Sequence, residues 1–151
     1  MSAKSKMPYV YLDDIATSDA AFKASGKTIE EAFLSAADAT MNVMVADLET
    51  IANHNRLTLH VESDEIDMLL FELLQELIFY KDADQLLLRL SDVCIRKMAD
   101  GGHYTLKAQA YGEQLNPEKH DLVVDVKAVT LHRFRVDQTP DGWEAMVILD
   151  I

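Results

Sequence analysis

The sequence predicts an α+β fold in which two amphipathic helices pack on one face of a mostly antiparallel sheet. Two patterns carry this prediction. Apolar residues recur at helical spacing in two stretches, residues 29–45 and 66–78. Most of the remaining chain alternates apolar and polar residues, or consists of short β-prone runs that end at turn residues. The expected order of elements is β-β-α-β-α-β-β-β-β, within a single domain that spans residues 1–151.

The chain begins with strands and then enters the first helix. Residues 9–13 and 20–25 are short β-prone runs. Thr28 and Glu31 follow at the spacing of a capping box, in which the hydroxyl and the carboxylate satisfy backbone N–H groups at the start of a helix. We therefore expect Thr28 to cap the first helix.

The second helix follows a half-buried strand. Residues 57–62 alternate apolar and polar side chains, which places His60 on the polar face of that strand. Ser63 or Asp64 is expected to cap the helix, because small polar residues at this position accept hydrogen bonds from the first turn. The apolar stripe then ends near Lys81.

The second half of the chain is expected to be β. Its strand segments are, in order, residues 86–98 (one long strand or two), 104–111, 123–136 and 143–151. Asp100-Gly101-Gly102 and Pro140-Asp141-Gly142 are turn sequences between neighbouring segments. Strands joined by such turns form antiparallel hairpins.

The last strand ends with unusual chemistry for a surface terminus. The apolar run 146–149 is followed by Asp150 and Ile151, so the Asp150 carboxylate and the terminal carboxylate lie one residue apart. Two negative charges on an ordered strand end repel each other unless a cation or hydrogen-bond donors compensate them. A hard metal ion, which takes carboxylate oxygens, is one explanation; a solvated strand end is the other.

Charge and composition exclude several classes of protein. The 151 residues carry a net charge of -12 at pH 7, which argues against direct binding of nucleic acid, because phosphate contacts need clustered Lys and Arg. No stretch approaches the length of a membrane span, and the N-terminus lacks an apolar signal core, so we expect a cytoplasmic protein with no membrane contact. The single Cys94 cannot form an internal disulfide, and we expect a buried or half-buried thiol.

A search for catalytic motifs leaves only carboxylates. The sequence has no nucleophile elbow, P-loop, dinucleotide fingerprint or Cys-x-x-Cys, and its histidines show no metal-ligand spacing. The remaining candidates for binding chemistry are Asp13, Asp14, Asp19, Asp47 and Asp150. Taken singly, each of them is better explained as a capping or solvated residue than as a ligand.

Four segments carry a resemblance to a known family. They are Tyr11-Leu12 with Gly-Lys-Thr-Ile-Glu-Glu-Ala-Phe at 26–33, Leu-Leu-Phe-Glu-Leu-Leu-Gln-Glu-Leu at 69–77, Gly112-Glu113 with His120 and Val-Lys-Ala-Val-Thr at 126–130, and Val-Ile-Leu-Asp-Ile at 147–151. Together they resemble the archease family, over nearly the whole chain and in the right order.

One part of the family pattern is altered. Counting back from Gly26 aligns residues 15–19 with the family's Asp-His-Thr-Ala-Asp motif, so the final Asp is kept as Asp19. The first Asp and the His of that motif are replaced by Ile15 and Ala16. These replacements affect the expected contact with a partner, whereas the metal-binding carboxylate remains.

The resemblance implies an accessory protein, not an enzyme, that helps an RtcB-type RNA ligase of tRNA splicing to become guanylylated and to turn over repeatedly. It implies a divalent ion, calcium or magnesium, held by Asp19, Asp150 and the terminal carboxylate of Ile151. Lys127 and His120 match functional positions, and Lys127 would contact phosphate or an acidic group of the ligase site; a solvated strand lysine is the alternative. The ligase is then the partner, tRNA is contacted only indirectly, and the protein is expected to be a monomer.

Two other functions remain open. The same carboxylates would serve a small divalent-metal-dependent hydrolase, although no general base or nucleophile accompanies them. Alternatively, the protein is a binding module that kept the fold and lost the ligase role, a reading motivated by Ile15 and Ala16.

Overall fold

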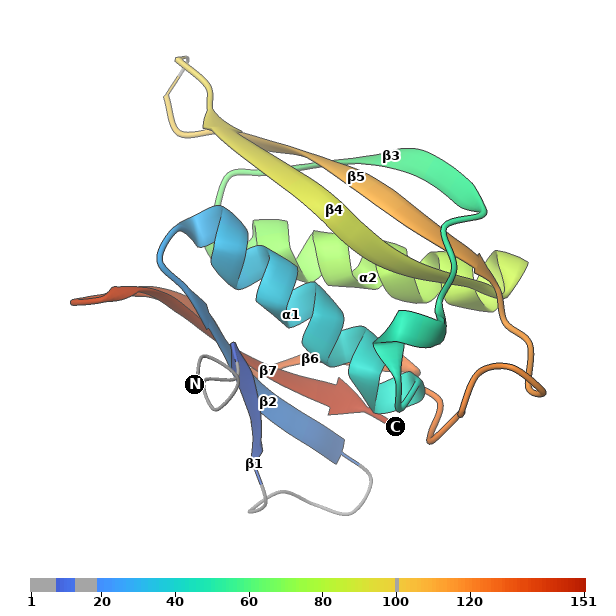
Figure 1. Cartoon of the computed structure of the whole chain (residues 1–151). Coiled ribbons are helices and arrows are strands. Elements are labelled where there is room, and N and C mark those ends of the chain that lie inside the picture. Colours follow the sequence, from blue (N-terminus) through green and yellow to red (C-terminus); the bar gives the residue numbers. More distant parts are fainter. Residues whose placement is uncertain (1–7, 13–18, 100) are drawn as a thin grey trace.

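The computed structural model describes residues 8–12, 19–99 and 101–151, and its strands form two antiparallel sheets (Figure 1). The first sheet has the order β1-β2-β7-β6, formed by β1 (Tyr9–Leu12), β2 (Asp19–Gly26), β7 (Gly142–Asp150) and β6 (Ala128–Thr139). The second has the order β3-β5-β4, formed by β3 (Asn55–Ser63), β5 (Tyr104–Gln114) and β4 (Leu86–Lys97).

The helices α1 (Ile29–Met44) and α2 (Ile66–Asp84) lie between these sheets (Figure 1). α1 packs against β2 and β7 on one side and β4 on the other, whereas α2 packs against β6 on one side and β3 and β4 on the other. A short 3-10 helix, η2 (Leu48–Thr50), follows α1. The α+β class and the predicted order of elements are confirmed.

The strands divide between two sheets, whereas the sequence predicts one sheet with both helices on one face. The reason is visible in α1, which buries residues over most of its circumference: Ala32, Phe33, Ser35, Ala36, Ala37, Ala39, Thr40, Met41 and Met44. A helix buried on more than one side needs apolar cover on more than one side. The core is therefore continuous from the first sheet through the helices to the second.

The helix starts agree only in part with prediction. Thr28 caps α1 as expected, since its hydroxyl accepts a hydrogen bond from Glu31 N at 3.1 Å while the Glu31 carboxylate accepts one from Lys27 N at 2.9 Å. The prediction for α2 is wrong: Glu65 is the N-cap and makes no side-chain capping bond, and Ser63 accepts instead from Glu65 N.

Two further expectations fail in the second half of the chain. The strand predicted for residues 123–136 begins only at Ala128, because the backbone before it bonds to the end of α1, with Val123 N donating to Met44 O at 2.9 Å. Cys94 is exposed, because it pairs with Lys107 on the outer face of the second sheet. The segment 86–98, for which one strand or two were expected, is the single strand β4 with an irregularity between Leu90 and Asp92.

In the described part of the chain, neither helix combines the length and apolar content that crossing a membrane requires.

Candidate functional site

The first candidate site lies where β2 and β7 pair at the end of the chain. Their antiparallel register places Asp19 directly opposite Asp150. Residues opposite each other in such a ladder project from the same face of the sheet. On β7, Leu149 points into the core beneath the helices, whereas Ile148 packs in a small cluster on the other face. Asp19 and Asp150 therefore share the face that is turned away from the helices.

The segment that leads into β6 brings the backbone of Lys127 next to Asp150. Lys127 N donates to Asp150 O at 2.8 Å, and the next residue, Ala128, is the register partner of Asp150. The Lys127 side chain is exposed. Ile151 follows Asp150 directly and is half-buried. The structure thus brings together four of the five residues predicted from the sequence.

Oxygen ligands at this site are few. Among residues 8–12, 19–99 and 101–151, no group of three or more His, Cys, Asp or Glu side chains is arranged to hold a metal ion, and neither Asp19 nor Asp150 has an ion-pair partner. Like charges directly opposite each other on a sheet are destabilising. The two carboxylates are hard oxygen donors of the kind that calcium and magnesium prefer, and a third would have to come from the Ile151 carboxylate.

A buried hydroxyl lies on the same face as the carboxylates. Thr130 on β6 is the register partner of Ile148, so it lies two residues along β6 from Ala128, the register partner of Asp150. Its Oγ1 is buried and has no hydrogen-bond partner within the described residues. A buried hydroxyl with no protein partner is uncommon, and a bound water or ion is one group that could satisfy it.

His120, the fifth predicted residue, belongs to a different cluster. It is only 2% exposed. Its Nδ1 accepts a hydrogen bond from Asn116 N at 2.9 Å, and its Nε2 lies 2.9 Å from a Glu113 carboxylate oxygen. Because a backbone N–H occupies Nδ1, the proton of the neutral ring is on Nε2 and is donated to Glu113. No hydrogen bond or ion pair in the described regions joins His120 to Asp19, Asp150 or Lys127, and its functional role stays a prediction.

Glu113 is the centre of this second cluster. Its carboxylate accepts hydrogen bonds from Ala52 N at 2.9 Å and from His120, pairs with Lys119 Nζ at 2.6 Å, and lies 3.3 Å from His54 Nδ1. Burial alone would raise the pKa of Glu113, but the hydrogen bonds from Lys119, Ala52 and His120 outweigh it and lower the pKa to about 2. The cluster ties the segment before β3 to the loop after β5.

In the sequence, Glu113 stands out only as part of the Gly112-Glu113 motif. The signal was present in the spacing of Gly112-Glu113 and His120, but the donors from Ala52 and Lys119 come from backbone and loop geometry that spacing does not reveal. Among the other carboxylates, Asp47 is a capping residue, which accepts from Glu49 N at 3.0 Å. Asp13, Asp14, Ile15 and Ala16 lie outside the described residues.

We expect Glu113→Gln to destabilise the protein near pH 7 by about 1–3 kcal/mol, because it replaces an ionised acceptor of several hydrogen bonds. The folded-state pKa of about 2 lies below the ordinary 4.5, so the unfolded chain takes up this proton first as the pH falls. The stabilisation is complete above about pH 5 and is lost toward pH 2. Chemical denaturation measured from pH 7 to pH 3 should show that the difference in free energy of unfolding between parent and variant becomes smaller as the pH falls. Glu118→Gln changes an exposed acid of the same loop and serves as the control. If the difference in unfolding free energy between parent and Glu113→Gln did not depend on pH, the lowered pKa of Glu113 would be contradicted.

Comparison with known proteins identifies the family. Residues 9–151 match the model of the archease protein family (MTH1598/TM1083). The archease protein of Pyrococcus abyssi is 37% identical over 136 residues, covering 89% of this chain and 94% of the relative, and that of Methanosarcina barkeri is 36% identical over 152 residues, covering 100% of both.

Solved structures agree with the sequence comparison. The solution structure of Methanobacterium thermoautotrophicum protein 1598 superposes with a TM-score of 0.82 at 29% identity, over 96% of this chain and 99% of that one. A Thermotoga maritima crystal structure, described as an archease and possible chaperone, shares the fold with a TM-score of 0.61 at 17% identity, over 93% of this chain and 97% of that one. The chain therefore belongs to the archease family.

Proposed function

We propose that this protein is an accessory protein of an RtcB-type RNA ligase in tRNA splicing, and that it promotes guanylylation and repeated turnover of the ligase. The observation that carries the proposal is the pairing of Asp19 with Asp150 in a member of the archease family. These are two of the residues to which the family resemblance assigns a divalent ion. The role is that of an activator, and the ligase performs the chemistry.

A divalent ion fits the donors that the structure presents. Asp19 and Asp150 supply carboxylate oxygens from neighbouring strands, and the carboxylate of Ile151 would complete the protein ligands. When bound, calcium or magnesium supplies the positive charge that two facing carboxylates lack. The orphaned Thr130 hydroxyl supports this reading, because a water of the ion's hydration shell would give it a partner.

Lys127 is the cation that the site offers to a partner. Its backbone N–H is fixed on Asp150, whereas its side chain is exposed. A Lys ammonium held at this position would pair with a phosphate or an acidic group of the ligase site. The overall charge of -12 repels a polyanion, so tRNA is left to the ligase, and this protein acts on the ligase as a monomer.

Metal-dependent stabilisation tests the ion site. Calcium or magnesium in place of a chelator should raise the melting temperature of the parent, with a gain of about 2.7 kcal/mol when free metal is one hundred times the dissociation constant. Asp150→Asn should lose most of this gain because it removes a charged ligand, and residues appended after Ile151 should do the same. Asp141→Asn, at the exposed turn of the same sheet, should keep it. A parent that shows no shift at millimolar metal would exclude the ion site.

Thr130→Val gives an independent readout of the same site. In chelator, the variant should be as stable as the parent or more stable, since a buried hydroxyl without a partner costs about 1–3 kcal/mol. With metal, its gain in melting temperature should be smaller than the parent's, because the bridging water loses a hydrogen bond. Thr139→Val near the other end of β6 serves for comparison. Destabilisation of Thr130→Val in chelator would mean that the hydroxyl already has a partner.

A ligase turnover assay tests the function itself. Adding the parent protein to an RtcB-type ligase should increase the number of ligations per ligase molecule, and Lys127→Ala should reduce that stimulation while keeping the metal-dependent melting shift. Lys107→Ala, an exposed lysine of the second sheet, should behave as the parent. If the parent gives no stimulation, the proposed function is wrong. If Lys127→Ala stimulates fully, Lys127 is not part of the contact.

A further inference from the structure

An exposed apolar ridge precedes β6. It consists of Leu122, Val123 and Val124, whose exposed fractions are 40%, 58% and 41%. Single apolar residues are common on protein surfaces, but contiguous ones mark sites of interaction. Two of its residues, Val123 and Val124, lie in the part of the predicted strand 123–136 that does not form.

The ridge is held at both ends. On one side, Val123 N donates to Met44 O at 2.9 Å and Ala46 N donates to Asp121 O at 2.9 Å. On the other, the buried Lys81 ammonium donates to Val126 O at 2.8 Å and pairs with Asp125. Burial would lower the pKa of Lys81, but its hydrogen bonds to Asp125 and Asp82 raise it, so the ammonium stays charged and the anchor persists. The apolar side chains are therefore presented in a fixed arrangement, which reduces the entropy lost on binding.

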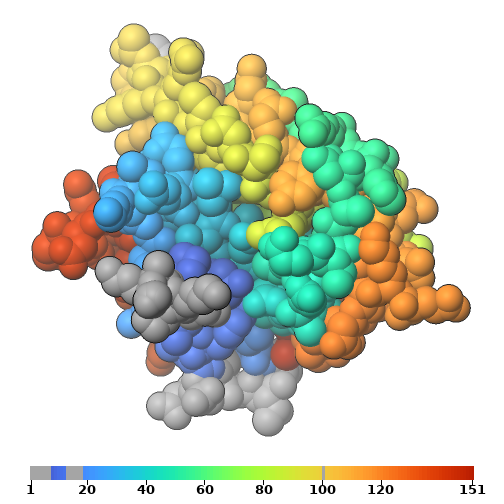
Figure 2. Space-filling view, in the orientation of Figure 1, coloured from blue at the N-terminus to red at the C-terminus, as the bar shows by residue number. Residues whose placement is uncertain are grey.

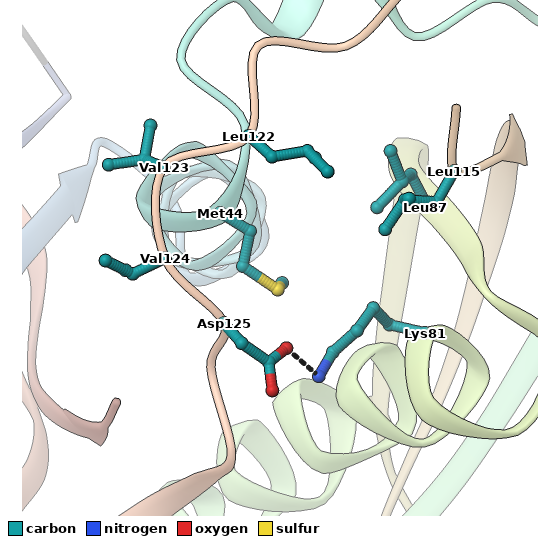
Figure 3. A pocket seen from close by; sticks show the side chains of 8 residues that line it. All are labelled: Met44, Lys81, Leu87, Leu115, Leu122, Val123, Val124 and Asp125. Atoms are coloured by element: carbon teal, nitrogen blue, oxygen red, sulfur yellow. Dashed lines mark hydrogen bonds and ion pairs between the residues drawn. The ribbon is translucent and has the colours of Figure 1, made fainter. Parts of the chain in front are cut away.

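A small apolar pocket lies beside the ridge (Figure 3). Its volume is about 190 Å³, and it is lined by the ridge with Met44, Leu87, Leu115, Lys81 and Asp125. Leu122 extends from the ridge toward Leu115 and Leu87, and the Lys81–Asp125 ion pair closes another side. The pocket has room for one apolar side chain rather than for a cofactor, because cofactor sites usually occupy 300 Å³ or more.

Charge indicates what kind of partner fits. The carboxylates around the pocket are exposed, with side-chain exposure of 64% for Asp125 and 56% for Asp82, and Asp121 at the start of the ridge is exposed as well. The nearby Lys81 is buried and fully engaged with its acceptors. An apolar group flanked by Lys or Arg complements this surface, whereas RNA does not.

The ridge is continuous with the candidate ion site. Val126 leads from it to Lys127, whose backbone N–H binds Asp150. In the space-filling view the red end of the chain emerges between the blue strands of the first sheet and the orange segment that precedes β6 (Figure 2). A partner that reaches Lys127 and the end of β7 therefore meets the ridge as well.

We propose that the ridge and its pocket form the docking surface for the ligase, and that they receive an apolar side chain of the ligase flanked by basic residues. This inference rests on the proposed function and adds the place and chemistry of the contact. In this proposal the ion site and Lys127 serve to activate the ligase, and the ridge provides most of the affinity for the ligase.

Calorimetric titration of purified ligase into this protein tests the inference. The double variant Val123→Ser/Val124→Ser should bind the ligase at least tenfold more weakly than the parent. Its melting temperature and its metal-dependent shift should stay within error of the parent's, because both side chains are exposed. Leu131→Ser, which removes an apolar side chain that is 61% exposed on β6, is the matched control and should bind as the parent. Asp121→Lys should also weaken binding, and the loss should shrink at high salt.

The outcomes separate the inference from the function on which it rests. A parent that neither binds nor stimulates the ligase overturns the proposed function. A parent that stimulates the ligase, together with a double variant that binds with unchanged affinity, overturns only the docking surface. If Leu131→Ser weakens ligase binding as much as the double variant does, the docking surface is also overturned, because the effect would not be specific to the ridge. So does a parent dimer that the double variant cannot form, because the ridge would then be buried between two copies.

Discussion

β7 lies between β2 and β6, and the alignment of these three strands determines both the core of the first sheet and the candidate site. Val147 and Leu149 of β7 face the helices, and Ile148 faces the other way. A slip of one residue would turn Asp150 toward the helices and Leu149 toward the opposite face. An unpaired carboxylate in the apolar core is far more costly than a surface one, so core packing enforces the register that sets Asp19 opposite Asp150.

Among the described residues, the buried Lys81 and Glu113 and the largely buried Arg89 use their charges to make structural bonds. Arg89 of β4 donates two hydrogen bonds, of 3.1 and 3.0 Å, to the Asp38 carboxylate of α1, and this pair links the helix to the second sheet. Its hydrogen bonds to Asp38 raise the pKa of Arg89, although burial opposes them. The hydrogen bond from Lys81 to Val126 O holds the segment after residue 121. The bonds of Glu113 with Lys119 and His120 hold the segment before it. By contrast, Lys127, Asp19 and Asp150 make no side-chain ion pair with the described residues.

The sequence predicted correctly those features that depend on interactions between residues close together in the chain. The Thr28 cap depends on residues three positions apart, and the order of elements follows from apolar periodicity. Cys94 was misjudged because its apolar neighbours Val93 and Ile95 suggested burial, whereas alternation along β4 turns it outward. The composition of residues 123–127 suits a strand, but none forms there because the backbone of Val123 bonds to the end of α1.

The sequence indicated which residues belong to the candidate site, but it did not indicate how they are arranged in space. The resemblance selected Asp19 and Asp150, but their meeting depends on the register of strands far apart in the sequence, which no local pattern encodes. The structural role of His120 was hidden for a similar reason, because the Asn116 N–H that fixes its ring is a product of the loop fold.

The pairing of β2 with β7 also has a consequence for the order of events in folding. Because one strand comes from the beginning of the chain and the other from its end, their contact closes the longest loop that this topology contains. Such non-local contacts form slowly, after the local hairpins and helices. During synthesis, the β4–β5 hairpin and both helices are available before β7 has been made. The carboxylate pair therefore arises only once the first sheet is assembled, and an ion bound there would bind the completed fold and none of its precursors.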